Sequence, residues 1–192
     1  MLSDIKIGIK IIAGFIILIF AGSFIGITGM VYIKKIEKSD TYLHKNITLS
    51  LENVMVIATS FHRIRVNMRD MIRNNDLEEI NKNKDRIKEL SEIMNKHIDN
   101  MEEKQLSDNL TDELKILKSS IKNYNNHLDE IISLAKTNKD EEAIAILDGK
   151  GEVSVNEVRD CLDRMMAVIT EDAKNTSENN RESANNATMV MI

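Results

Sequence analysis

The sequence predicts an all-α protein in which a transmembrane helix continues into an antiparallel, up-down-up-down four-helix bundle. Three observations support this fold class. The chain of 192 residues contains no proline, so no residue forbids long uninterrupted helices. The 23 residues from Ile11 to Ile33 carry no charged side chain, and roughly 20 apolar residues are what a helix needs to cross a bilayer. The rest of the chain is charged, with apolar residues at steps of three and four, which is typical of bundled helices.

Composition and motifs argue against several classes of function. The 31 acidic and 26 basic residues give a net charge of −5, so electrostatics provide no reason to expect a nucleic acid as a partner. The single cysteine, Cys161, excludes an intramolecular disulfide, and we expect it to be a small buried residue on an apolar helical face. Nucleotide-binding loops, GxSxG, CxxC, HExxH and Glu-x-x-His pairs are absent from the sequence. We therefore expect no enzyme, no metal site and no cofactor.

Residues 11–33 form the expected transmembrane helix. The apolar run is longer than the 7–15 residues of a signal peptide and has no clear Ala-x-Ala site, so an uncleaved anchor is favoured. Lysines flank both ends, and the positive-inside rule gives no orientation. Gly22, Gly26 and Gly29 place small residues near one face, which would let a second span approach closely, although such spacing also arises by chance.

The first bundle helix is predicted to continue from the span to Arg73 without a break. One face has core spacing, and it consists of Val54, Ile57, Phe61, Ile64, Met68 and Met71. A second stripe on the far side is apolar in its first half, which suggests a helix-to-helix dimer interface. This stripe consists of Leu51, Met55, Ala58, His62, Val66, Arg69 and Arg73.

The second helix is predicted to follow a break at residues 74–76. Asp76 is the expected N-cap, with Glu79 three residues later as in a capping box. The helix should run to about Glu103. Its inward residues are Ile80, Ile87, Leu90, Met94, Ile98 and Met101.

The third helix has the most regular period of the chain, with Ser107 or Thr111 as its expected cap. Steps of four and three alternate without interruption, which is the 3.5-residue repeat of coiled-coil-like packing. A short helical turn, Asp140 to Leu147, and a flexible joint with Gly149 and Gly151 are expected after it. The predicted core residues of the third helix are Leu110, Leu114, Leu117, Ile121, Tyr124, Leu128, Ile131 and Ala135.

The fourth helix is predicted to begin near Glu152. Its inward residues are first large (Val155, Val158, Leu162, Met165 and Ile169) and then small (Ala173, Thr176, Ala184 and Ala187). The final residues 187–192, ATMVMI, are again apolar and suggest the start of a truncated second span, with a loose apolar tail as the alternative. Four antiparallel helices return the chain to the side of the membrane that it left, which agrees with this organisation.

The candidate binding residues lie in the segment FHRIRVNMRDMIR of the first bundle helix. Arg65, Arg69 and Arg73 are spaced i, i+4 and i+8, so they share one sector of the helix, and His62 precedes them. Guanidinium groups bind carboxylates through paired hydrogen bonds. Two copies facing each other would form a pocket for a small carboxylate. The alternative is that these arginines are solvated or pair with acidic residues such as Asp70.

Three segments carry a resemblance to a known family: IKIGIKIIAGFIILIF, FHRIRVNMRDMI and DEEAIAILDGKG. With the predicted architecture, they resemble the four-helix-bundle ligand-binding domain of bacterial methyl-accepting chemotaxis proteins. The resemblance implies a homodimeric receptor in the cell membrane. It assigns residues 1–10 to the cytoplasm, 11–33 to the first span, 34–186 to the extracytoplasmic sensor bundle and 187–192 to the second span.

The resemblance also implies where a ligand binds. Family members bind small molecules in the distal part of the bundle, often across the dimer interface, with arginines of the first helix and residues at the start of the fourth. The matching positions here are Arg65, Arg69 and Arg73, with Ser154 and Asn156.

The expected function is therefore extracytoplasmic ligand sensing. A ligand would displace the fourth helix, whose residues 173–187 are small and offer little resistance to sliding, and so reach a cytoplasmic signalling region that this sequence lacks. Two alternatives stay open from the residues: the sensor domain of a membrane histidine kinase or cyclase, and a membrane-anchored structural bundle without a ligand.

Overall fold

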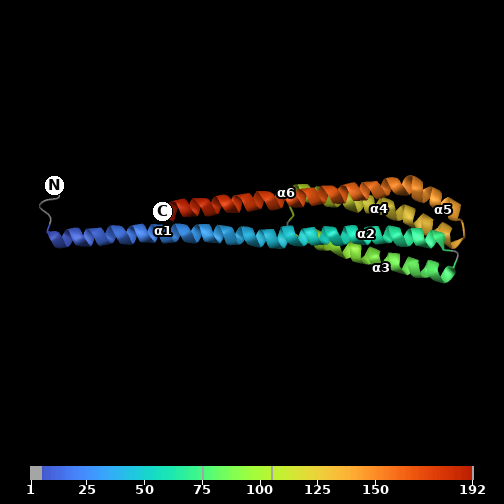
Figure 1. Cartoon of the computed structure of the whole chain (residues 1–192), viewed down its shortest axis with the longest axis horizontal. Helices are drawn as coiled ribbons and strands as arrows, with labels where there is room; N and C mark the ends of the chain where they lie inside the picture. The colour runs from blue at the N-terminus through green and yellow to red at the C-terminus, as the bar shows by residue number, and fades with distance from the viewer. Residues whose placement is uncertain (1–5, 75, 105, 192) are drawn as a thin grey trace. The chain divides into compact units, whose positions relative to one another are not determined.

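The computed structural model describes residues 6–74, 76–104 and 106–191, which are almost entirely helical and contain no β-strand (Figure 1). The all-α bundle prediction is confirmed. The contacts divide the chain into two units, His44–Asp172 and α1 with the part of α6 from Ala173 onward, and each is described by itself. The elements are α1 (Ile7–Tyr42), the π-helical η1 (Leu43–Thr48), α2 (Leu49–Arg73), α3 (Leu77–Glu102), α4 (Asp108–Lys136), α5 (Asp140–Ile146), the π-helical η2 (Leu147–Gly151) and α6 (Glu152–Met191).

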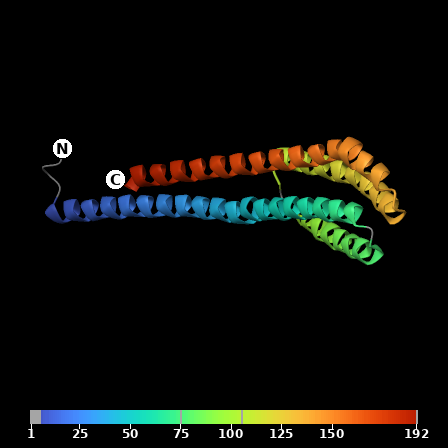
Figure 2. The same cartoon turned by 45° about the vertical axis from the view of Figure 1, so that its right-hand side comes forward.

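The unit His44–Asp172 is the four-helix bundle. Helix α2 contacts α3 and α4, α3 also contacts α4, and the short α5 packs on α4 and α2. Figures 1 and 2 both show α3 alongside α2 and α4 alongside the first half of α6. The short connections make consecutive helices antiparallel, as the sequence predicts.

Helix α2 faces the core with the predicted residues, from Val54 to Met71, and all six of them are buried. Its opposite stripe is partly open, since Met55 and Val66 are 55% and 43% exposed. Apolar side chains at this exposure are available for contact with another surface. The dimer interface at this stripe stays a prediction.

Helix α3 begins at the predicted cap. The Asp76 carboxylate accepts a hydrogen bond from the backbone N–H of Glu78 at 2.9 Å, which satisfies one of the free amide groups of the first turn. The Glu79 carboxylate pairs with Lys82 at 3.1 Å, so this side chain does not serve as the second half of a capping box. All six predicted inward residues of α3 are buried.

Helix α4 buries all eight residues of its predicted repeat. The ring of Tyr124 packs edge-on against Phe61 of α2, with centroids 4.8 Å apart and an interplanar angle of 66°, a favourable aromatic geometry. Ser107 occupies the N-cap position, as predicted, but its hydroxyl donates to the carboxylate of Asp172 at 2.8 Å. The start of α4 is thereby tied to α6.

The joint between α4 and α6 depends on its two glycines. Gly149 has φ −97° and ψ −110°, which interrupts the helical backbone. Gly151 is buried, and a Cβ atom there would lie 2.8 Å from the carbonyl oxygen of Ile146. Because that oxygen belongs to the backbone and cannot move aside easily, residue 151 must lack a side chain.

The first part of α6 buries its predicted apolar face together with Cys161. The Cys161 thiol donates to the carbonyl oxygen of Glu113 on α4 at 3.2 Å. The Glu113 carboxylate accepts from Nε of Arg164 at 2.9 Å. These contacts fasten α6 to α4. The bond from Arg164 holds the pKa of Glu113 below its usual value, and burial raises the pKa of Cys161 to about 12.

The second unit consists of α1 and the last part of α6. Among the described residues, one continuous helix, Ile7–Arg73, is long and apolar enough to cross a membrane. Phe15 and Phe20 in its apolar stretch are 63% and 72% exposed. Gly29 is buried, and so are Ser183 and Ala187 of α6. The prediction that Ala184 faces inward was wrong: it is exposed, because the three-four spacing continues through Ser183.

Candidate functional site

Arg65 forms an ion pair between α2 and α6. Its Nη2 atom lies 3.5 Å from Oε2 of Glu152, and the two side chains are 17% and 40% exposed. Glu152 stands in the first turn of α6, where a negative charge is also favoured by the helix dipole. Arg65 therefore already has a carboxylate partner from its own chain, as in the alternative considered for these arginines.

Arg69 and Arg73 lie in a different environment, because both are exposed and border a shared cavity. The cavity has a volume of about 160 Å³, and its other lining residues are Ile72, Ile144, Leu147 and Asp148. Two guanidinium groups thus stand at one opening with one carboxylate. This combination suits a small anion that competes with the Asp148 carboxylate for the guanidinium groups.

The remaining predicted residues do not converge on that cavity. His62 is exposed on α2. Ser154 is buried, and its hydroxyl donates to the carbonyl oxygen of Lys150 at 3.3 Å. Asn156 accepts from Arg159 at 2.7 Å. The structure therefore brings Arg69 and Arg73 together at one cavity. It places the polar group of Ser154 in a contact with η2 and that of Asn156 in a contact within the start of α6.

Tyr124 lies in the core near the arginine cluster. Burial raises the pKa of its phenol well above the usual value, and the nearby charges of Arg65 and Arg69 act in the opposite direction. The hydroxyl contacts the sulfur of Met68 at 3.8 Å. A phenol held neutral in this way supports packing and has no suitable role in proton transfer.

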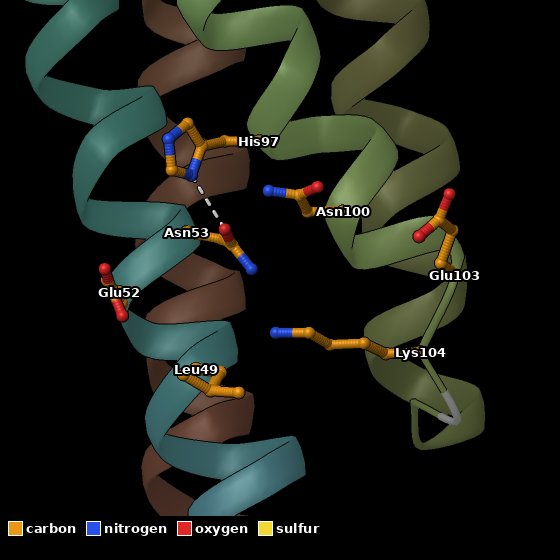
Figure 3. Close-up of a pocket in the computed structure, with 7 residues that line it drawn as sticks. All are labelled: Leu49, Glu52, Asn53, His97, Asn100, Glu103 and Lys104. Carbon is orange, nitrogen blue, oxygen red and sulfur yellow. Dashed lines mark hydrogen bonds between the residues drawn. The ribbon is translucent and has the colours of Figure 1, made fainter.

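A second, polar cavity of about 410 Å³ lies between α2 and the end of α3 (Figure 3). Asn53 is its most deeply placed polar residue, with 6% of its surface exposed. The Oδ1 atom of Asn53 lies 2.7 Å from Nδ1 of His97. The full lining is Leu49, Glu52 and Asn53 from α2, with His97, Asn100, Glu103 and Lys104 from the end of α3 and the turn after it.

Lys104 contributes the positive charge of this α2–α3 cavity. Burial lowers the pKa of its ammonium group, and the negative charge of Glu52 partly opposes that shift. Among the described residues, no carboxylate pairs directly with Lys104 within 4.0 Å. A partly desolvated ammonium group without a direct counter-ion is a good binding group for an anion.

Sequence reasoning did not find the α2–α3 cavity. The histidines of the sequence are scattered, and the bond from His97 to Asn53 joins residues 44 positions apart. One signal was available: Asn53 and Ser60 continue the core spacing through Ile57 on α2, and both are buried. Buried polar side chains at core positions require partners, so these two positions indicate a contact that the apolar pattern alone does not explain.

An apolar groove of about 570 Å³ runs beside the polar cavity, and Glu52 lines both. Leu51 and Met55 from the predicted dimer stripe of α2 form part of its wall. The apolar lining is completed by Val56 of α2 and by Leu90 and Ile93 of α3. The α2 stripe is therefore part of a hollowed apolar surface that also includes α3.

Comparison with known proteins agrees with the architecture. The model of a family described as a four helix bundle sensory module for signal transduction matches residues 4–184 of this chain. No curated protein and no solved structure matches the chain. The match covers α1 to α5 entirely, together with most of α6. The chain therefore belongs to the family of four-helix-bundle sensory modules for signal transduction.

Proposed function

We propose that this chain is the extracytoplasmic, ligand-sensing part of a transmembrane chemotaxis receptor. The observation that carries the proposal is the continuous helix from Ile7 to Arg73. Its first part is charge-free over residues 11–33 with most side chains exposed, and its last part forms the core face of a sensory bundle. A helix of this kind anchors the bundle in a membrane and contributes directly to its core.

The proposed topology follows the assignment made from the sequence. Residues 1–10 lie in the cytoplasm, residues 11–33 span the membrane, and residues 34–186 form the bundle outside the cytoplasm. Residues 187–192 begin a second span. The exposed apolar side chains of α1 support the span over residues 11–33, because a surface such as that of Phe15 and Phe20 is stable in lipid and costly in water.

The receptor acts as a homodimer in this proposal. The interface is the α2 stripe with Met55 and Val66, which are large apolar residues with about half of their surface exposed. A second copy of the same stripe would cover these residues and the apolar groove beside them. Dimers with two-fold symmetry use the same patch on both subunits, so cysteines placed at position 55 should cross-link between subunits, and cysteines at the exposed Asn95 of α3 should not.

The ligand of this proposal is a small carboxylate bound at the distal cavity of Arg69 and Arg73. Both guanidinium groups are exposed and border the same opening. Paired hydrogen bonds from arginine are the preferred contacts of a carboxylate. The carboxylate of Asp148 at the same opening is the group with which the ligand competes for the two arginines.

Ligand binding is passed on by a small displacement of α6. The buried residues of its last part are small, as Ser183 and Ala187 illustrate. Small side chains interdigitate less deeply than large ones, so a shift along the helix axis disturbs fewer contacts. Disulfides that join the last part of α6 to α1 should block the response, whereas a cysteine at the exposed Ala184 should leave it intact.

A chimera that joins this chain to the cytoplasmic part of a chemotaxis receptor tests the proposal. Kinase output is measured while amino acids, organic acids and aromatic acids are added. We expect a carboxylate to change the output, Arg69→Gln and Arg73→Gln to abolish that response, and Arg86→Gln on α3 to preserve it. A chimera that responds to no compound, with unchanged thermal stability in every compound, contradicts the proposal and favours a structural bundle.

A further inference from the structure

The α2–α3 cavity is organised by the contact between His97 and Asn53. The Oδ1 atom of Asn53 lies 2.7 Å from Nδ1 of His97 (Figure 3). An amide oxygen only accepts hydrogen bonds, so Nδ1 of His97 carries the proton and donates it. The amide nitrogen of Asn53 is then turned away from His97, toward the side on which Lys104 lies.

Two further nitrogen donors point into the same space. Figure 3 shows the amide of Asn100 and the ammonium group of Lys104 extending from the end of α3 and its following turn toward α2. Asn53 is buried, and Asn100 and Lys104 are half-buried. Two amide donors and one charged donor around one space match the lone pairs of a carboxylate.

The opening of the cavity has the opposite charge. Glu52 and Glu103 are exposed, line the cavity and stand on its two sides in Figure 3. Two carboxylates against the single ammonium of Lys104 give the cavity a formal charge of −1. This charge repels a dianion, and the outer carboxylates attract a cationic group near the opening.

We propose that the α2–α3 cavity binds a small zwitterion, whose carboxylate contacts Lys104, Asn53 and Asn100 and whose cationic group faces Glu52 and Glu103. The volume of about 410 Å³ lies within the range of small-molecule sites. All of the groups come from one copy of the chain, so the site is complete without a dimer. It is also separate from the arginines Arg69 and Arg73, which line a different cavity.

Isothermal titration calorimetry on the full chain in detergent micelles tests the proposal. The probes are glycine, β-alanine and glycine betaine as zwitterions, acetate and succinate as anions, and choline as a cation. We expect at least one zwitterion to bind more tightly than acetate, and succinate and choline to show no heat of binding. Lys104→Gln should weaken the zwitterion at least about tenfold, because a charge-assisted hydrogen bond is lost.

One control variant and one variant at the opening of the cavity separate this site from other effects. Lys115→Gln removes an equally positive but exposed side chain on α4, which pairs with Asp112, and should leave binding unchanged. Glu103→Gln removes the charge of an exposed side chain at the opening of the cavity, and it should reduce the preference for the zwitterion over acetate. Circular dichroism confirms that each variant retains its helices.

Several results would overturn the inference. These are the absence of binding by all three zwitterions, equal affinity for acetate and the zwitterions, or equal binding by Lys104→Gln and the original chain. Loss of zwitterion binding in Arg69→Gln would show that the zwitterion binds at the distal cavity instead. The proposed carboxylate response of the chimera depends on that distal cavity, so either proposal can fail while the other stands.

Discussion

Replacing Leu117 by alanine tests the core of the bundle most directly, because its neighbour Ile116 serves as a matched control. Leu117 has 0% of its surface exposed, whereas Ile116 is 45% exposed on the same helix. Leu117→Ala removes about three buried carbon groups, which corresponds to roughly 2.4 kcal/mol of transfer free energy. The cavity that the substitution leaves adds a further cost, so the free energy of unfolding should fall by about 3–4 kcal/mol in total.

The cost of Ile116→Ala should be much smaller. About half of this side chain is already in water, so little apolar surface is lost and no enclosed cavity forms. Alanine also has a higher helix propensity than isoleucine by a few tenths of a kcal/mol, which offsets part of the loss. The expected net change in the free energy of unfolding is about 0.5 kcal/mol or less.

Thermal unfolding of the full chain in detergent, followed by circular dichroism at 222 nm, measures both changes. For a bundle of this size we expect Leu117→Ala to lower Tm by roughly 10 °C or more and Ile116→Ala by about 2 °C or less. Equal losses in the two variants, or a larger loss for Ile116→Ala, would show that the register assigned to α4 is wrong.

Three further outcomes are expected from contacts in the same unit. Gly151→Ala should destabilise the bundle by about 1–3 kcal/mol in the same unfolding assay, because the Cβ atom of the alanine would lie 2.8 Å from the carbonyl oxygen of Ile146. An unchanged Tm would contradict the described joint. The pKa of Glu113 is lower in the folded state, so the stability that it contributes is present above its unfolded pKa and is lost as the pH falls through the folded pKa. In urea unfolding from pH 7 to pH 3, the free energy of unfolding should therefore decline less for Glu113→Gln than for the original chain. The thiol of Cys161 is buried, and its pKa is raised to about 12. Ellman's reagent at pH 8 should therefore react rapidly with it only after denaturation. Fast reaction with the native chain would refute the burial of this thiol.

The apolar spacing predicted the bundle core because it depends on local geometry. Leu110 to Ala135 alternate at three and four residues, and a helix with that pattern has one buried face whatever its partners are. The same reasoning identified the core faces of α2 and α3 and the position of the Asp76 cap. These features follow from residues within a few positions of one another.

Features that depend on contacts between distant segments were not predictable in the same way. The bond between Asn53 and His97 requires α2 and α3 to be aligned at one register, which no short segment specifies. Ser107 or Thr111 was expected to cap α4; Ser107 occupies the N-cap position, but its hydroxyl donates to the carboxylate of Asp172 instead of capping the helix. The error at Ala184 came from choosing the apolar residue, although in this stretch a small side chain at the right spacing, Ser183, takes the buried position.

The π-helical segment η1, Leu43–Thr48, has a consequence for how the length of this chain can vary. Its turn holds about one residue more than an α-helical turn. A relative that lacks one residue between Leu43 and Thr48 can close the same stretch as ordinary α-helix, and the residues before and after it keep their faces. Within α2, losing one residue would rotate every later position of that helix by about 100° and turn its later core residues away from the bundle. Single-residue differences in length between members of this family should therefore be more frequent at this segment than within α2.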